Sequence, residues 1–175
     1  LNETEDPFTY LGLITDFNGI DVEQSRDYVK ISCANYIDRI YTSHNWDDDT
    51  SMKPASKPIA PLPTDTLHSL SIQAGHTEGT QEHQVLEDKK GFSYRTLLGE
   101  IMYAYVSCRP DIGYPITLLS KYASSPSAYH YDKLKGIAKF LRTTRDWGII
   151  FKRSAPRIEL PTGTAKSIPV EKQTQ

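Results

Sequence analysis

Cysteine is scarce in this sequence, which contains only Cys33 and Cys108 among its 175 residues. Two cysteines cannot build the disulfide framework of a small secreted domain, and these two lack the paired spacing of zinc ligands. We therefore predict two reduced, partly buried thiols in an intracellular protein. Long apolar runs are also missing, since no stretch approaches the roughly 20 residues that a transmembrane helix needs. The N-terminus lacks Met and any signal-peptide pattern, so we expect Leu1 to lie inside a longer protein, with the removal of a leader as the alternative.

The sequence has no excess of basic residues, since 20 Lys and Arg stand against 22 Asp and Glu and the net charge is -2. This balance argues against a strongly basic nucleic-acid-binding protein. The charges are nevertheless unevenly distributed: residues 1–90 carry 16 Asp and Glu against 7 Lys and Arg, whereas residues 91–175 carry 6 against 13. A polyanion would therefore prefer the second half, because phosphate contacts release counterions and supply affinity that does not depend on sequence.

No pattern in the sequence predicts a metal centre or a catalytic nucleophile. The consecutive carboxylates Asp47, Asp48 and Asp49 cannot all face one ion from a regular element, and no calcium-loop spacing surrounds them. The histidines show no zinc-type spacing, and no serine lies in a nucleophile elbow. We predict no catalytic residue, no metal ligand and no cofactor in this chain, and we interpret the three aspartates as a solvated acidic loop.

Residues 1–45 predict a β-hairpin followed by a short helix. The hairpin consists of an apolar, β-prone run at 8–14, a turn at 16–19 and a strand at 20–32. A helix is predicted at 34–43, where apolar side chains recur at helical spacing, and it ends near His44. The apolar side chains of this helix are Ile37, Ile40 and Tyr41.

Residues 46–90 differ in character from the segments on either side. Prolines interrupt any regular element here, and polar residues fill the gaps between them. We predict a long, irregular, acidic surface loop that contains a short helix at 82–89. Residues 154–175 are rich in Pro, Thr, Ser and Lys, and we predict a disordered tail.

Residues 91–153 predict three helices and a following strand at 149–151. Ser93 is a candidate N-cap for the first helix, Pro110 suits the first turn of the second, and Ser125 with Pro126 predicts the start of the third. Each helix carries an apolar stripe. The stripes are Leu97, Leu98, Ile101, Met102 and Tyr105; Ile112, Ile116, Leu119 and Tyr122; and Leu134, Ile137, Ala138 and Leu141.

The third of these helices also carries a basic face. Lys135, Lys139 and Arg142 fall at i, i+4 and i+7, opposite the apolar stripe. Such a face can track a nucleic-acid backbone by charge without reading its sequence. An ordinary solvated helix face has the same composition, so the spacing leaves both interpretations open. Arg109 with Asp111 predicts an inter-helix turn in which a capping carboxylate pairs with an arginine.

The order of motifs in this half resembles one family, the Ty1/copia-type reverse transcriptases of LTR retrotransposon Pol polyproteins. The matching residues lie in the region that follows the polymerase palm in that family. They are Leu98-Gly99-Glu100-Ile101-Met102-Tyr103, Arg109-Pro110-Asp111-Ile112, Leu119-Ser120-Lys121, Pro126, His130 and Lys139-Phe140-Leu141-Arg142. The resemblance implies the end of a palm at 1–45 and a three-helix thumb and connection at 91–153. The Pro-rich acidic loop at 46–90 departs from the shorter spacer of many members of the family, and the disordered tail at 154–175 is predicted from composition alone.

The resemblance also implies which residues hold nucleic acid. Tyr10, Leu11 and Gly12 match the primer grip, where a residue without Cβ lets the backbone approach the primer closely. Taken alone, this tripeptide fits a plain strand bulge better, and its position upstream of the matching helices is what favours the primer grip. The basic face of the third helix would contact the backbone of an RNA or DNA primer-template, with the missing palm and RNase H regions as further partners.

The resemblance does not bring catalysis with it. The parent polymerase needs palm aspartates, including a Tyr-x-Asp-Asp turn, to bind Mg²⁺, and neither that motif nor an RNase H aspartate cluster occurs here. We therefore expect an α+β fragment of an RNA-directed DNA polymerase that positions nucleic acid and is inactive alone, inside the cell and without membrane contact. The alternative is a domesticated or decaying fragment that acts as a protein-interaction module.

Overall fold

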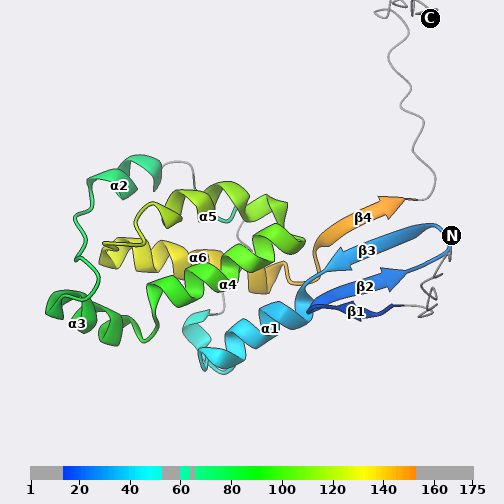
Figure 1. The fold of residues 1–175 in the computed structure, drawn as a ribbon, viewed down its shortest axis with the longest axis horizontal. Coiled ribbons are helices and arrows are strands. Elements are labelled where there is room, and N and C mark those ends of the chain that lie inside the picture. The colour runs from blue at the N-terminus through cyan, green and yellow to red at the C-terminus, as the bar shows by residue number, and fades with distance from the viewer. Residues whose placement is uncertain (1–13, 53–59, 64–65, 153–175) are drawn as a thin grey trace, which may run out of the picture.

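The computed structural model describes residues 14–52, 60–63 and 66–152. They form a four-stranded antiparallel sheet at one end of a group of helices (Figure 1), so the predicted α+β class is confirmed. The strands lie in chain order: β1 (Asp16–Phe17), β2 (Ile20–Gln24), β3 (Tyr28–Ser32) and β4 (Gly148–Lys152). The helices are α1 (Ala34–Ser43), α2 (Thr66–Ile72), α3 (Gln81–Lys90), α4 (Tyr94–Ser107), α5 (Gly113–Ser120) and α6 (Ala128–Thr143), with 3₁₀ turns η1 (Thr50–Met52) and η2 (Pro110–Ile112).

The first strands form two hairpins where the sequence predicted one. Asn18 and Gly19 make the first turn with φ of 53° and 79°, a pair of left-handed residues that suits the twist of a two-residue hairpin. Asp16 and Phe17 therefore lie in β1, and their assignment to the turn was wrong. The predicted strand at 20–32 is also interrupted, because the Ser25 hydroxyl accepts the N–H of Tyr28 at 3.1 Å and closes a second turn.

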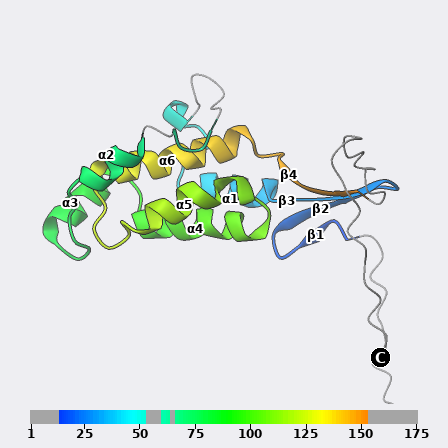
Figure 2. The same ribbon diagram turned by 90° about the horizontal axis from the view of Figure 1, so that it is seen from above.

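The last strand joins the sheet from the far end of the described chain. A strand was predicted at 149–151, and β4 is its observed form, paired antiparallel with β3 so that Ser32 lies opposite Gly148. A side chain at Gly148 would not fit, because a Cβ there would lie 2.1 Å from the backbone oxygen of Ile31. Figure 2 shows the sheet edge-on as a thin layer that extends away from the helices.

The predicted helices form because their apolar stripes converge on one core. α1, α4, α5 and α6 pack together, and all three predicted stripes contribute buried side chains to the cluster between them. The Tyr41 hydroxyl donates to the Ala138 carbonyl at 3.1 Å, and the Tyr94 hydroxyl donates to the Leu119 carbonyl at 2.9 Å. Burial raises the pKa of both phenols, so these hydroxyls stay protonated and keep donating.

The described residues of the segment 46–90 include regular elements and buried side chains that a surface loop would lack. It contains η1, α2 and α3, of which α3 corresponds to the helix predicted at 82–89. Trp46, Met52 and Leu70 belong to the core, with 6%, 1% and 0% of their surface exposed. The prediction of a surface loop was wrong for these three residues. Isolated apolar residues in a segment with many prolines show neither helical nor strand periodicity, so the sequence did not indicate their burial.

The described part of the chain has no helix that is both long enough and apolar enough to cross a membrane.

Candidate nucleic-acid interface

The candidate interface lies on α6, the longest helix of the described chain. This helix begins at Ala128 because Ser127 and His130 form a capping box: Ser127 Oγ accepts the His130 N–H, and His130 Nδ1 accepts the Ser127 N–H at 2.9 Å. The predicted cap at Ser125 was wrong by two residues. The apolar stripe of α6 is buried as predicted, which turns Lys135, Lys139 and Arg142 toward its partly exposed side.

Lys135 is held by two groups from the acidic segment that follows α1. Its ammonium lies 3.7 Å from Asp49 Oδ2, and it lies over the Trp46 ring at 5.4 Å from the centroid. A cation over an aromatic face is attracted by the negative ring surface. The Lys135 side chain is 24% exposed, so part of its charge still faces solvent.

Arg142 is held by α1 in a similar way. Its guanidinium pairs with the Asp38 carboxylate and lies over the Tyr41 ring, 4.8 Å from the centroid. Arg145, just beyond the end of α6, places Nη2 2.6 Å from the other Asp38 oxygen. One carboxylate of α1 therefore neutralises part of the charge of two arginines, while Lys139 lies half-buried between Lys135 and Arg142 on α6.

The end of α1 explains why the acidic segment lies against α6. Asn45 adopts a left-handed φ of 56° and turns the chain back, so that the Trp46 N–H donates to the Tyr41 carbonyl at 2.9 Å. Asp47 Oδ2 accepts the Thr42 hydroxyl at 2.8 Å. Trp46 then stacks on His44 at 4.6 Å and meets Phe92 edge-on at 5.4 Å, which fixes the segment to the core.

Asp49 is the carboxylate of this segment that faces α6. Hydrogen bonds from Ser51 and, less strongly, the charge of Lys135 lower its pKa, so it stays ionised. A cavity of about 250 Å³ lies beside it. The lining residues of this cavity are Tyr41, Trp46, Asp47, Asp49, Met52, Arg142 and Thr143.

Arg109 and Asp111 form the predicted turn, and Arg109 has a further role that the spacing did not indicate. Its guanidinium forms a bidentate pair with Asp111, at 2.9 and 2.7 Å, and the arginine is 1% exposed. Arg109 also donates to the backbone carbonyl of Thr144 at 3.1 Å and to its hydroxyl at 2.7 Å. The motif therefore ties η2 to the C-terminal end of α6 and is part of the fold.

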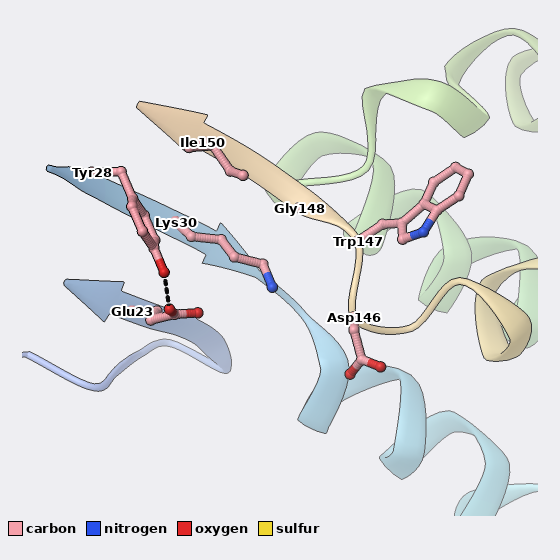
Figure 3. Close-up of a pocket in the computed structure, with 7 residues that line it drawn as sticks. All are labelled: Glu23, Tyr28, Lys30, Asp146, Trp147, Gly148 and Ile150. Atoms are coloured by element: carbon pink, nitrogen blue, oxygen red, sulfur yellow. Dashed lines mark hydrogen bonds between the residues drawn. The ribbon is translucent and has the colours of Figure 1, made fainter. Parts of the chain in front are cut away.

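A second pocket, of about 440 Å³, lies on the sheet (Figure 3). In this view the Tyr28 hydroxyl points at Glu23, whereas the Trp147 ring turns away from Tyr28 toward the helices. The hydrogen bond to Glu23 raises the pKa of Tyr28. Glu23 and Asp146 both line this pocket, and two carboxylates repel phosphate, so we do not assign nucleic acid to it.

Three further points concern the primer-grip residues, metal ligands and the partners of the basic face. Tyr10, Leu11 and Gly12 lie outside the described residues. Within the described ranges, no three His, Cys, Asp or Glu side chains gather into a group that could hold a metal ion. Asp38 and Asp49, the partners of the basic face, were not predicted, because they come from segments distant in sequence and no local spacing links them to α6.

The chain is similar to segments of proteins of transposon origin. It is 33% identical over 101 residues, 58% of its length, to the Retrovirus-related Pol polyprotein from transposon RE2 of Arabidopsis thaliana. It is 26% identical over 153 residues, 83% of its length, to the Retrovirus-related Pol polyprotein from transposon TNT 1-94 of Nicotiana tabacum. It is also 34% identical over 79 residues, 45% of its length, to Secreted RxLR effector protein 161 of Plasmopara viticola.

These matches cover only parts of the relatives. The chain spans 6% and 10% of the two Pol polyproteins and half of the effector protein. No family model matches the chain, and no solved structure matches it. The recurrence of Pol polyproteins among the relatives supports a retrotransposon Pol-like origin for the chain.

Proposed function

We propose that this chain is the part of a Ty1/copia-type reverse transcriptase that runs from the end of the palm through the thumb and connection, and that it positions a primer-template without catalysing polymerisation. The observation that carries the proposal is the order of the family motifs along α4, η2, α5 and α6, which ends in three cations on α6. The similarity to Pol polyproteins supports the same origin. The parent enzyme would supply the palm aspartates and Mg²⁺, and it would act inside the cell.

The proposed contact is electrostatic and independent of sequence. Lys135, Lys139 and Arg142 follow one side of a helix with a rise of about 1.5 Å per residue, so they span about 10 Å. This length reaches two or more phosphates along one strand, which are several ångströms apart. Binding of this kind weakens steeply as the salt concentration rises, because it depends on counterion release.

A first test neutralises the basic face. We expect the variant K135Q/K139Q/R142Q to lose about tenfold in affinity for an RNA–DNA primer-template at low salt, because three phosphate contacts are removed. The slope of log affinity against log salt should also fall by up to about 3, at roughly 0.9 for each contact. Fluorescence anisotropy with a labelled duplex measures both quantities.

The matched control removes the same charges elsewhere. R26Q/K89Q/K152Q also replaces two lysines and one arginine, all exposed and none on α6. We expect this control to retain most of the affinity. Equal losses in both variants would mean that net charge alone governs binding, and unchanged affinity in the α6 variant would reject the proposed interface. Circular dichroism of each variant checks that the helices remain folded.

A protein-interaction module is the second candidate function. It is favoured by the pairing of Lys135 and Arg142 with Asp49 and Asp38, which reduces the charge available for phosphate. On this view the α6 face is a structural contact, and duplex binding does not depend on it. The test above separates the two candidates, since only the first predicts an affinity loss specific to α6.

A further inference from the structure

The three cations proposed to bind nucleic acid are not equally available. Lys135 and Arg142 already have carboxylate partners, from the segment after α1 and from α1 itself. Arg145 extends the same positive surface past the end of α6, and it shares the Asp38 carboxylate with Arg142. The two carboxylates, Asp49 and Asp38, occupy positions beside these cations that phosphate oxygens would otherwise take.

The two carboxylates are held in place by other interactions of their own. Asp38 sits in the middle of α1, whose position is fixed by the buried side chains Ile37, Ile40 and Tyr41. Asp49 accepts the Ser51 N–H at 2.8 Å, and its segment is anchored by the buried Trp46 ring. Ordered partners of this kind lose little conformational entropy when they pair, so they compete well with a ligand.

We infer that Asp38 and Asp49 compete with phosphate groups for the cations of α6, so that the free chain partly masks its own nucleic-acid-binding face. This inference rests on the function proposed above and adds a regulation of the same site. A phosphate that binds Lys135 displaces Asp49, and one that binds Arg142 and Arg145 displaces Asp38. The acidic segment at 47–49 thereby weakens duplex binding without touching the duplex.

The two contacts should differ in how easily they are displaced. The Lys135–Asp49 pair is long, at 3.7 Å, and 24% and 33% of the two side chains are exposed. The Asp38 carboxylate binds two guanidinium groups at once, with Arg145 at 2.6 Å. A longer, single pair is weaker than a carboxylate with two charge-assisted partners, so a phosphate should displace Asp49 from Lys135 more easily than Asp38 from Arg142 and Arg145.

The test replaces each carboxylate with its neutral amide. In the full chain, we expect D49N and D38N each to raise affinity for a labelled RNA–DNA duplex by about two- to fivefold at low salt, which is the range for releasing one partly exposed ion pair. The double variant D38N/D49N should also steepen the salt dependence, because more cations then exchange counterions with phosphate. Asn keeps an oxygen that can accept the Ser51 N–H, so the segment retains its local bond.

The matched control is D48N, which makes the same charge change between Asp47 and Asp49 at an exposed position. It should raise affinity by less than either test variant. If D38N and D49N match D48N while K135Q/K139Q/R142Q still loses affinity, the masking is wrong and the proposed interface stands. If the wild type does not bind but D38N/D49N does, both ideas are supported. If no variant binds the duplex at low salt, both are overturned.

Discussion

Replacing Arg109 with Met should lower the free energy of unfolding by about 3 kcal/mol, because the change removes a buried guanidinium and leaves the buried Thr144 carbonyl without the hydrogen bond it accepts. Asp111 would lose both of its charge-assisted bonds, and the Thr144 carbonyl and hydroxyl would lose theirs. The guanidinium also contacts the Phe140 and Trp147 rings at 5.7 and 5.9 Å, and these contacts would weaken. Urea unfolding followed by circular dichroism measures the change.

Two further variants define what Arg109 contributes. R109K keeps the positive charge but cannot reproduce a planar fork that binds Asp111 and Thr144 together, so we expect it to recover less than half of the lost stability. R95A removes an exposed arginine whose side chain is 57% accessible and paired with Glu78, and it should change stability by less than about 1 kcal/mol. Similar losses of stability for R109M and R95A would show that the contacts of Arg109 contribute no more than an exposed ion pair.

Replacing His130 with Ala is the second large effect, again about 3 kcal/mol at neutral pH. The change removes the acceptor for the Ser127 N–H, a capping contribution of about 1 kcal/mol. It also leaves the Leu70 carbonyl without its 3.0 Å bond from His130 Nε2, at a cost of about 1–3 kcal/mol. The imidazole stacks on Tyr122 at 4.0 Å as well, so its removal opens a cavity beside that ring.

The same histidine should make stability depend on pH. Burial lowers the pKa of His130 below its ordinary value of 6.5, because the folded chain favours the neutral ring. The unfolded chain binds the proton more readily than the folded chain. The contribution of His130 to the free energy of unfolding is therefore complete above about pH 6.5 and is lost as the pH falls through the lowered pKa. We expect the melting temperature to fall between pH 7 and pH 5.

H130Q separates the capping role from the titration. Gln is a usual partner in this capping box and does not titrate, so H130Q should be more stable than H130A and should show a flatter pH profile than the wild type. H76Q removes an exposed histidine and should leave the wild-type profile unchanged. An H130Q profile as steep as the wild type would mean that other groups govern the acid sensitivity.

The helices were predictable because their signals are local. The stripe of Ile37, Ile40 and Tyr41 predicts α1 at its observed bounds, since helical periodicity needs only neighbouring residues. The start of α6 was misjudged because Ser125, Pro126 and Ser127 offer competing signals. In the structure Ser127 is the N-cap, and His130 completes its capping box. The usual residue at the position of His130 is Glu or Gln, so the sequence does not show the usual capping-box pattern here.

The arrangement of the sheet and the partners of the basic face were not predictable in the same way. No local sequence signal predicts that Ile149 lies opposite Ile31, because the pairing joins segments far apart in sequence. Likewise, Lys135 and Arg142 are visible as a basic face, whereas Asp38 and Asp49 become its partners only when α1 packs beside α6. The burial of Trp46 was not predicted, because its neighbours in the sequence are polar.

The pairing of β3 with β4 has an architectural consequence. β3 leads into the helices and β4 leads out of them, side by side in one sheet, while β1 enters from the same outer end (Figure 1). The described chain therefore enters the sheet and leaves it at this one end. The helical part is inserted between β3 and β4, which are neighbours in the four-stranded sheet, so a change of length in an exposed loop between helices leaves the spacing of these two strands unchanged.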